Sequence, residues 1–154
     1  MQLVLEHTIR GMPVQWARAR IGNGGQKSFH TDVAQKRYKG LVRDEIALAY
    51  RSAKARGEHD GKPAPLGVPI IFDARFYLPI PESYTRQEEL AAREGRLRPT
   101  GKPDLDNWLK LPMDALSGIL YADDAQVVGF GESGKFYADT PKLVRLELRV
   151  WRLA

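Results

Sequence analysis

The strongest constraint on the fold is a strict alternation of apolar and charged residues near the C-terminus, from Leu143 to Leu153. Successive side chains of a β-strand point to opposite faces, so this pattern predicts a strand with one buried face. The apolar positions are Val144, Leu146, Leu148 and Val150, and between them lie Arg145, Glu147 and Arg149. Such a strand requires a sheet and a second layer that covers its apolar face.

Two further stretches alternate in the same way, Leu3 to Ile9 and Leu66 to Ile80. Residues 126–130 and 135–137 predict one more strand, interrupted by a bulge over residues 129–134. In the first stretch, one face is expected to carry Leu3, Leu5, His7 and Ile9.

Two stretches between these strands have the apolar spacing of amphipathic helices. The first begins at Thr31 or Asp32, either of which can cap it, and runs to about Arg56. The second begins at Pro103 or Asp104 and runs to about Leu116, and Pro112 in its interior is expected to kink or split it. The apolar face expected for the first helix is broad: Val33, Tyr38, Leu41, Val42, Ile46, Leu48 and Ala49.

This order of elements predicts the α/β (α+β) class, with a mixed β-sheet packed by two main helices. A chain of 154 residues has the length of one domain, so residues 1–154 are expected to form a single domain. Residues 82–102 form a highly charged excursion from it, with a short helix around 87–94. We expect this excursion to be exposed and mobile.

Composition excludes several classes of protein. The chain has no cysteine, which excludes disulfides and thiolate metal sites. No apolar run approaches the ~20 residues that a membrane-spanning helix needs. Residues Met1 to Arg10 also lack the apolar core of a signal peptide. We therefore expect a soluble, cytoplasmic protein with no membrane partner.

The distribution of charge is uneven along the chain. The net charge is +5, yet residues 103–132 hold only one basic residue, Lys110, against six acidic ones. Carboxylates repel the phosphates of a nucleic acid unless something neutralises them, and a divalent cation is the obvious candidate. The alternative is that these acidic residues decorate a solvated helix.

The acidic pair Asp104 and Asp106 is the sharpest local motif. Residues two apart lie on opposite sides of an ideal helix, so their carboxylates converge only if Asp104 lies at the N-cap and Asp106 in the first turn. Lys110 and Asp114 follow Asp106 at spacings of four and share its face. The motif alone favours the alternative in which these residues only cap the helix and form ordinary surface ion pairs.

A second acidic pair, Asp123 and Asp124, shifts the interpretation from helix capping towards a functional site. Consecutive residues in an extended segment point to opposite faces, so only one of the two is expected to join the helix carboxylates. Three carboxylates from two elements form an oxygen-only site suited to Mg²⁺, with Mn²⁺ as a substitute. Such a site can promote phosphodiester hydrolysis, with Lys110 neutralising negative charge. The alternative is a plain acidic turn.

Basic residues elsewhere could surround this site and hold a nucleic-acid backbone. Solvated surface positions are the alternative for each of them taken singly. The chain is too short for the nucleotide domain of sugar-nucleotide transferases, which also use an Asp-x-Asp pair, so no nucleotide cofactor is expected. The candidate DNA-binding residues are Arg18, Arg20, Lys27, Lys36 and Lys102.

Several motifs occur together, in order, and resemble the RusA family of Holliday junction resolvases. The main block runs from Pro103 through Lys110 and Asp114 to Tyr121-x-Asp123-Asp124-x-Gln126-Val127. Other matching segments are Gly11-x-Pro13, Arg18-Ala19-Arg20, Phe29-His30-Thr31 and Lys135-x-Tyr137. The resemblance implies a homodimeric, Mg²⁺-dependent, structure-selective endonuclease that is often carried by bacteriophages or prophages. A bacterial cytoplasm is the setting it implies.

The resemblance also implies roles for single residues. Asp104 and Asp106 match the two metal ligands at the N-terminal end of the helix, and Lys110 matches the essential lysine. The third ligand falls on Asp124, with Asp123 as the alternative, because the turn after the helix is shorter here than in the best-studied members.

The function implied is resolution of four-way DNA junctions, by paired phosphodiester hydrolysis, in DNA recombination and repair. One alternative is a non-catalytic protein that binds branched DNA, whose acidic residues are caps and surface charge. Another is a nuclease with the same metal chemistry that also cuts flaps or forks.

Overall fold

The computed structural model describes residues 1–16 and 29–153, with the backbone alone for residues 29–32. The helices are α1 (Phe29–Ala55), α2 (Arg86–Arg93) and α3 (Leu105–Leu116), with short 3-10 helices η1 (Asp124–Gln126) and η2 (Pro141–Leu143). The strands are β1 (Gln2–Arg10), β2 (Ile70–Leu78), β3 (Val127–Phe130), β4 (Gly134–Tyr137) and β5 (Arg145–Arg152). Within the described residues, no helix combines the length and apolarity needed to cross a membrane.

The five strands form one mixed sheet, as predicted. β5 lies between β1 and β2 and is antiparallel to both. β3 and β4 both pair in parallel with β2, from Ile70 opposite Val127 to Leu78 opposite Tyr137. They therefore lie end to end on one edge of β2, interrupted at residues 131–133. The prediction of one bulged strand over residues 126–137 was wrong in that this edge holds two strands, because residues 131–133 separate β3 from β4.

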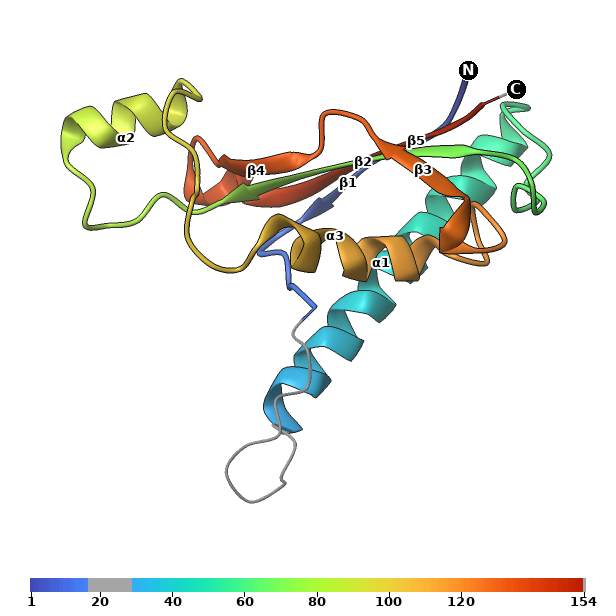
Figure 1. Ribbon diagram of the computed structural model, residues 1–154, viewed down its shortest axis with the longest axis horizontal. Helices are drawn as coiled ribbons and strands as arrows, with labels where there is room; N and C mark the ends of the chain where they lie inside the picture. The colour runs from blue at the N-terminus through green and yellow to red at the C-terminus, as the bar shows by residue number, and fades with distance from the viewer. Residues whose placement is uncertain (17–28, 154) are drawn as a thin grey trace.

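Helices α1 and α3 lie on the same side of the sheet and cover its apolar face (Figure 1). The strand residues that face them include Phe72, Phe76, Leu146 and Leu148, all fully buried. Together, helices and sheet enclose one core, and the predicted single-layer sheet with two main helices is confirmed. The third helix, α2, stands apart from this core at one end of the sheet (Figure 1).

The predicted apolar face of α1 is too broad. Its buried stripe repeats every four residues, at Tyr38, Val42, Ile46 and Tyr50. A helix that packs on one face of a sheet buries only a narrow stripe, so other apolar residues remain outside. The predicted face was wrong for three of its members, which are 46%, 47% and 61% exposed: Val33, Leu41 and Leu48. The helix also begins at Phe29, before the predicted caps Thr31 and Asp32.

β1 departs from simple alternation because of a bulge. Its pairing with β5 shifts between Leu3 and Leu5, which places an extra residue in the strand. Val4 and Leu5 are both buried as a result, and Leu3 is 45% exposed. The prediction that Leu3 shares a face with Leu5 was therefore wrong.

Pro112 does not split α3, which continues as one helix from Leu105 to Leu116. A proline removes only one amide donor from the helix ladder. Leu111, Ala115 and Leu116 around it are fully buried, and this packing holds the helix together. Of the expected kink or split, the split was wrong, and the kink stays a prediction.

Residues 82–102, here called the arm, contain α2, close to the predicted helix at 87–94. Thr85 and Glu88 form a capping box at its start. The arm is attached to β4 at both of its ends. Tyr84 and Tyr137 share a hydrogen bond of 2.7 Å between their hydroxyls. Arg98 donates from Nε to the Lys135 carbonyl at 2.9 Å. Mobility of the arm stays a prediction.

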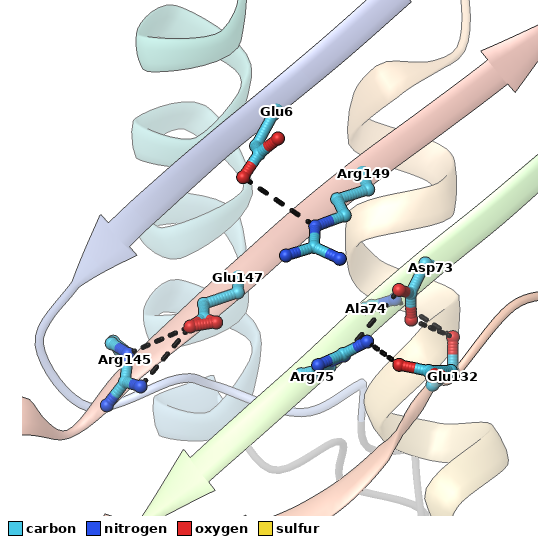
Figure 2. Close-up of polar contacts among 9 residues, drawn as sticks. Glu6, Asp73, Ala74, Arg75, Glu132, Arg145, Glu147 and Arg149 are labelled. Atoms are coloured by element: carbon cyan, nitrogen blue, oxygen red, sulfur yellow. Dashed lines mark hydrogen bonds and ion pairs between the residues drawn. The ribbon is translucent and has the colours of Figure 1, made fainter. Parts of the chain in front are cut away.

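The sheet face turned away from α1 and α3 carries several ion pairs, of which Glu6–Arg149 joins two strands (Figure 2). Arg149 on β5 lies 3.7 Å from Glu6 on β1. On β2, Arg75 pairs with Glu132 and lies 3.6 Å from the carboxylate of Asp73. Asp73 is only 2% exposed, so this face contains one buried carboxyl.

Candidate active site

Asp104 occupies the N-cap of α3 with an extended backbone, which is the position the motif predicted. Its side chain makes no capping hydrogen bond. Its two oxygens instead accept hydrogen bonds from Lys102 Nζ at 2.8 and 2.9 Å. The hydrogen bond from Lys102 lowers the pKa of Asp104, and the charge of Lys135 adds to the effect. The carboxylate of Asp104 is therefore ionised and does not serve as a cap.

The loop before α3 is held by a lysine from β4. Lys135 Nζ donates to the carbonyls of Gly101 at 2.9 Å and Pro103 at 3.1 Å. Lys135 belongs to one of the motifs that carry the family resemblance, but the sequence predicted no role for it. Contacts to backbone carbonyls leave no pattern in a sequence, so no signal could have identified this one.

The other end of α3 is held by an arginine from α1. Arg43 Nη1 donates to the carbonyls of Ala115 at 3.0 Å and Ser117 at 2.9 Å. The Tyr121 hydroxyl donates to the Met113 carbonyl at 2.7 Å. The last carbonyls of a helix have no partners within it, so these side chains satisfy them. Both ends of the helix that carries the candidate site are thus fixed by other elements.

The polar face of α3 carries Asp106, Lys110 and Asp114 at spacings of four residues. Asp106 is exposed in the first turn. Lys110 Nζ lies 3.7 Å from Asp114 Oδ2 and 5.7 Å from the centre of the Trp16 ring. Asp114 was not among the candidate site residues, although its spacing from Lys110 was the signal that could have included it.

The two carboxyls of the Asp123–Asp124 pair have different surroundings. Asp123 caps η1, and its Oδ1 accepts a hydrogen bond from the Ala125 amide at 2.8 Å, which lowers the pKa of Asp123. The pKa of Asp124 is raised, first by hydrogen bonding with Asp123, then by burial and by the neighbouring Asp114. Asp124 is therefore the member of the pair whose carboxyl lies near Asp114 of α3. Which of the two would hold a metal ion stays a prediction.

Gln126 fixes the segment that carries these carboxyls. Its side-chain amide donates to the carbonyls of Pro65 at 2.9 Å and Val68 at 3.0 Å. Its side-chain oxygen accepts a hydrogen bond from the Asp123 amide at 2.9 Å. Gln126 belongs to the matching motif, but its structural role was not predicted.

The structure thus gathers the acidic residues at two places on α3. Asp114 meets Asp124 near the helix end, with Lys110 beside them, and Asp104 pairs with Lys102 at the helix start. Among the residues that the structure describes, no group of three or more His, Cys, Asp or Glu is arranged to hold a metal ion. The available donors are aspartate oxygens, which fit a hard divalent cation in their chemistry.

The predicted DNA-binding residues divide into two sets. Arg18, Arg20 and Lys27 lie outside the described residues. Lys36 lies exposed on α1, and Lys102 lies exposed at the arm's end, where it pairs with Asp104. Lys102 therefore lies near the N-terminal end of α3, and its contact with DNA stays a prediction.

The mixed sheet and the face of aspartates and lysine on α3 define an α+β domain with a candidate active site of carboxylates and one lysine. The family model for endodeoxyribonuclease RusA matches residues 10–150. The chain therefore belongs to the RusA family of endodeoxyribonucleases. It is also similar to YqaN of Bacillus subtilis (strain 168), a protein described as uncharacterized, with 33% identity over 141 residues that cover 90% of this chain and 92% of YqaN.

Proposed function

We propose that this protein is a metal-dependent endodeoxyribonuclease that resolves four-way DNA junctions by paired phosphodiester hydrolysis, in DNA recombination and repair. Family membership supports nuclease chemistry. The observation that carries the proposal is the approach of α3 and η1, where Asp114 lies 3.7 Å from Lys110 and raises the pKa of Asp124. Carboxylates from two elements and one ammonium group thus border the same exposed face.

Mg²⁺, with Mn²⁺ as a substitute, is the cofactor of the proposed reaction. Asp104, Asp106 and Asp124 would hold it, with Asp123 as the alternative to Asp124. A bound divalent cation activates water and stabilises the oxygens of the phosphodiester. Lys110 places its ammonium group against the negative charge that develops on the phosphate.

The proposed substrate is branched DNA, and the proposed assembly is a homodimer. A two-fold dimer presents two identical sites, which suits paired cuts in a junction that has two-fold symmetry. Arg18, Arg20, Lys27, Lys36 and Lys102 are the proposed DNA contacts. The proposed location is a bacterial cytoplasm, with a phage or prophage as one possible source of the gene.

One observation favours the non-catalytic alternative. The described carboxylates form no three-ligand group, and Asp104 is already neutralised by Lys102. A protein of this kind would bind branched DNA without metal and without cutting, and its affinity would fall steeply with salt. The broader nuclease, which cuts flaps or forks as well, shares the metal chemistry and differs only in substrate.

The test is cleavage of a labelled four-way junction beside a linear duplex of the same sequence, with Mg²⁺, with Mn²⁺ and with a chelator. We expect paired nicks confined to the junction, which the chelator abolishes. Asp106→Asn should reduce cleavage to the level seen with chelator, and Lys110→Met should reduce kcat about 100-fold. The exposed Asp139 supplies the matched control, and Asp139→Asn should cut like the parent protein.

Three results would contradict this proposal in different ways. Binding without cutting in every condition supports the non-catalytic protein, and Asp106→Asn should then bind DNA slightly more tightly because a repulsive charge is lost. Equal cutting of junctions, flaps and forks supports the broader nuclease. Full cutting by Asp106→Asn would remove this residue from the active site.

A further inference from the structure

We propose that Lys135 is a positioning residue for the candidate active site. It holds the loop that positions Asp104 and Asp106 at the N-terminal end of α3. This inference rests on the proposed function, because it assigns Lys135 a task in the same site. Lys135 makes no described hydrogen bond or ion pair with an acidic side chain of the site or with Lys110, although its charge helps to lower the pKa of Asp104. Its hydrogen bonds go to the backbone of the loop that carries Asp104.

The contacts of Lys135 are hydrogen bonds to neutral carbonyls. Its ammonium group has three donors and no acceptor. Two of these donors reach Gly101 at 2.9 Å and Pro103 at 3.1 Å, two of the three residues before the N-cap. Hydrogen bonds from a charged donor are stronger than those between neutral groups. Lys135 therefore fixes the backbone of this loop.

The backbone of Lys135 is itself held in place by two other segments. On one side, Lys135 pairs with Phe76 in the parallel register of β2 and β4. On the other, its carbonyl accepts the hydrogen bond from Arg98 in the arm, and the Arg98 guanidinium lies 3.8 Å from the centre of the Phe136 ring. Lys135 thus joins three segments: the edge of the sheet, the end of the arm and the loop before α3.

The loop needs a contact from outside the helix because no capping hydrogen bond from Asp104 fixes it to α3. A capping side chain normally fixes the N-cap residue to the first turn of its helix. Asp104 makes no such bond, and its carboxylate accepts hydrogen bonds from the exposed Lys102 two residues earlier. With Lys135 removed, the direction in which Asp104 leaves the loop is no longer fixed from the sheet. A displacement of about 1 Å at a reacting group can cost on the order of 100-fold in rate.

A positioning role differs measurably from DNA binding by the same lysine. A lysine that contacts phosphate changes the affinity for DNA and the dependence of that affinity on salt. A positioning lysine changes kcat and leaves KM unchanged, since the loop carries the reacting groups and not the bulk of the DNA contacts. Arginine at this position should restore function, because its guanidinium also donates several hydrogen bonds.

The experiment compares Lys135→Met and Lys135→Arg with Lys142→Met, which removes a lysine from an exposed position on η2. The first measurement is hydrogen exchange of the amides of residues 104–109, without metal or DNA. We expect exchange at least about tenfold faster in Lys135→Met than in the parent protein, because the first turn opens more often. Lys142→Met and Lys135→Arg should exchange within about twofold of the parent.

The second measurement is steady-state cleavage of the four-way junction with Mg²⁺. We expect kcat to fall about 30-fold or more in Lys135→Met, with KM within about twofold, and to recover largely in Lys135→Arg. A KM that rises with kcat unchanged would overturn the inference, because Lys135 would then bind DNA. Exchange rates equal in Lys135→Met and Lys142→Met would overturn it as well.

Failure of the proposed function is a separate result. If the parent protein cuts no DNA, that function fails, and hydrogen exchange alone decides whether Lys135 holds the loop. If Lys135→Met does not fold, Lys135→Gln replaces it, since its shorter neutral amide does not reach both carbonyls. The same two measurements then decide.

Discussion

At the scale of single residues, side chains that bond to distant backbone carbonyls hold the candidate site in place. Gln126 is one of these, and it joins η1 to the segment at Pro65 and Val68, about 60 positions earlier in the chain. Gln126 is 7% exposed, so its partners are largely shielded from water. A buried carbonyl that loses its donor retains the full cost of its desolvation.

Gln126→Leu should therefore lower the free energy of unfolding by about 2–3 kcal/mol. The shape of the side chain is nearly kept, but the Val68 carbonyl and the Asp123 amide lose this partner, and the Pro65 carbonyl keeps only the Val68 amide. Urea unfolding of Gln126→Leu and of Gln87→Leu, a control at an exposed position of α2, measures the difference. A loss below about 0.5 kcal/mol in Gln126→Leu would mean that water replaces these bonds.

Asp73 provides a test based on pH. Burial raises the pKa of Asp73, and the charge of Arg75 opposes the shift. A carboxyl whose pKa is higher in the folded than in the unfolded protein stabilises the fold most below its unfolded pKa of about 3.9. That stabilisation is lost as the pH rises through the folded-state pKa.

Asp73→Asn removes this dependence. The free energy of unfolding of the parent protein, relative to Asp73→Asn, should be lower at about pH 7 than at about pH 3.5. Urea unfolding at the two pH values measures this, and Asp139→Asn, at an exposed carboxyl, is the control. A relative stability that rises with pH would show that the pairing with Arg75 outweighs burial.

The residues of the site differ in how well the sequence predicts them. Asp104, Asp106, Lys110 and Asp124 follow from motif and spacing, because helical periodicity and the N-cap position are local properties. Lys135, Arg43 and Gln126 do not, because each bonds to carbonyls that belong to remote segments. The sequence thus predicts the candidate reacting groups and leaves out the residues that orient them.

At the scale of elements, strands were predicted well, since alternation is a strong local signal. The helix boundaries fall within a few residues of those expected. The attachment of the arm was not predicted, because the contacts of Tyr84 and Arg98 join residues far apart in sequence. The exposed side of α1 was also missed, since apolar residues alone do not reveal which face meets the sheet.

Gly134 leaves room for the Arg98 side chain where the arm is attached to β4. A Cβ at this position would lie 2.5 Å from Nη2 of Arg98 and 3.3 Å from the Phe136 ring. Gly134→Ala should therefore displace the Arg98 guanidinium from Phe136 and from the Lys135 carbonyl. The arm would then open more often, and trypsin should cut it about tenfold faster after Arg93 and Arg96.

Mass spectrometry of the fragments over time measures this rate of cleavage. Gly40→Ala is the matched control, because a Cβ there meets nothing within 4 Å. If the arm of Gly134→Ala is cut no faster than that of Gly40→Ala, then Tyr84 and Tyr137 suffice to hold the arm.

At the scale of the whole molecule, the outer face of α1 is where we expect a second copy to bind. Val33, Leu41 and Leu48 lie on this face, opposite the buried stripe, and are exposed by about half or more. In an antiparallel pairing centred between Gly40 and Leu41, Val33 faces Leu48 of the other copy. Arg37 then faces the oppositely charged Asp44, and Gly40 leaves room for the partner's Leu41.

Leu41→Glu should therefore convert a dimer to a monomer, because it places two like charges at the centre of the pairing. Light scattering after size-exclusion chromatography measures the mass. Leu66→Glu, at a more exposed leucine in the loop before β2, is the control and should remain a dimer. If Leu41→Glu also stays dimeric, the two copies meet through another surface.

The attachment of the arm has a practical consequence. The arm leaves the sheet beside Tyr137 and returns beside Lys135. The residues at its tip therefore take no part in strand pairing. Surface turns of this kind tolerate inserted sequence. Gly95, in the turn after α2, is thus a suitable point to graft a fluorescent reporter or an affinity tag.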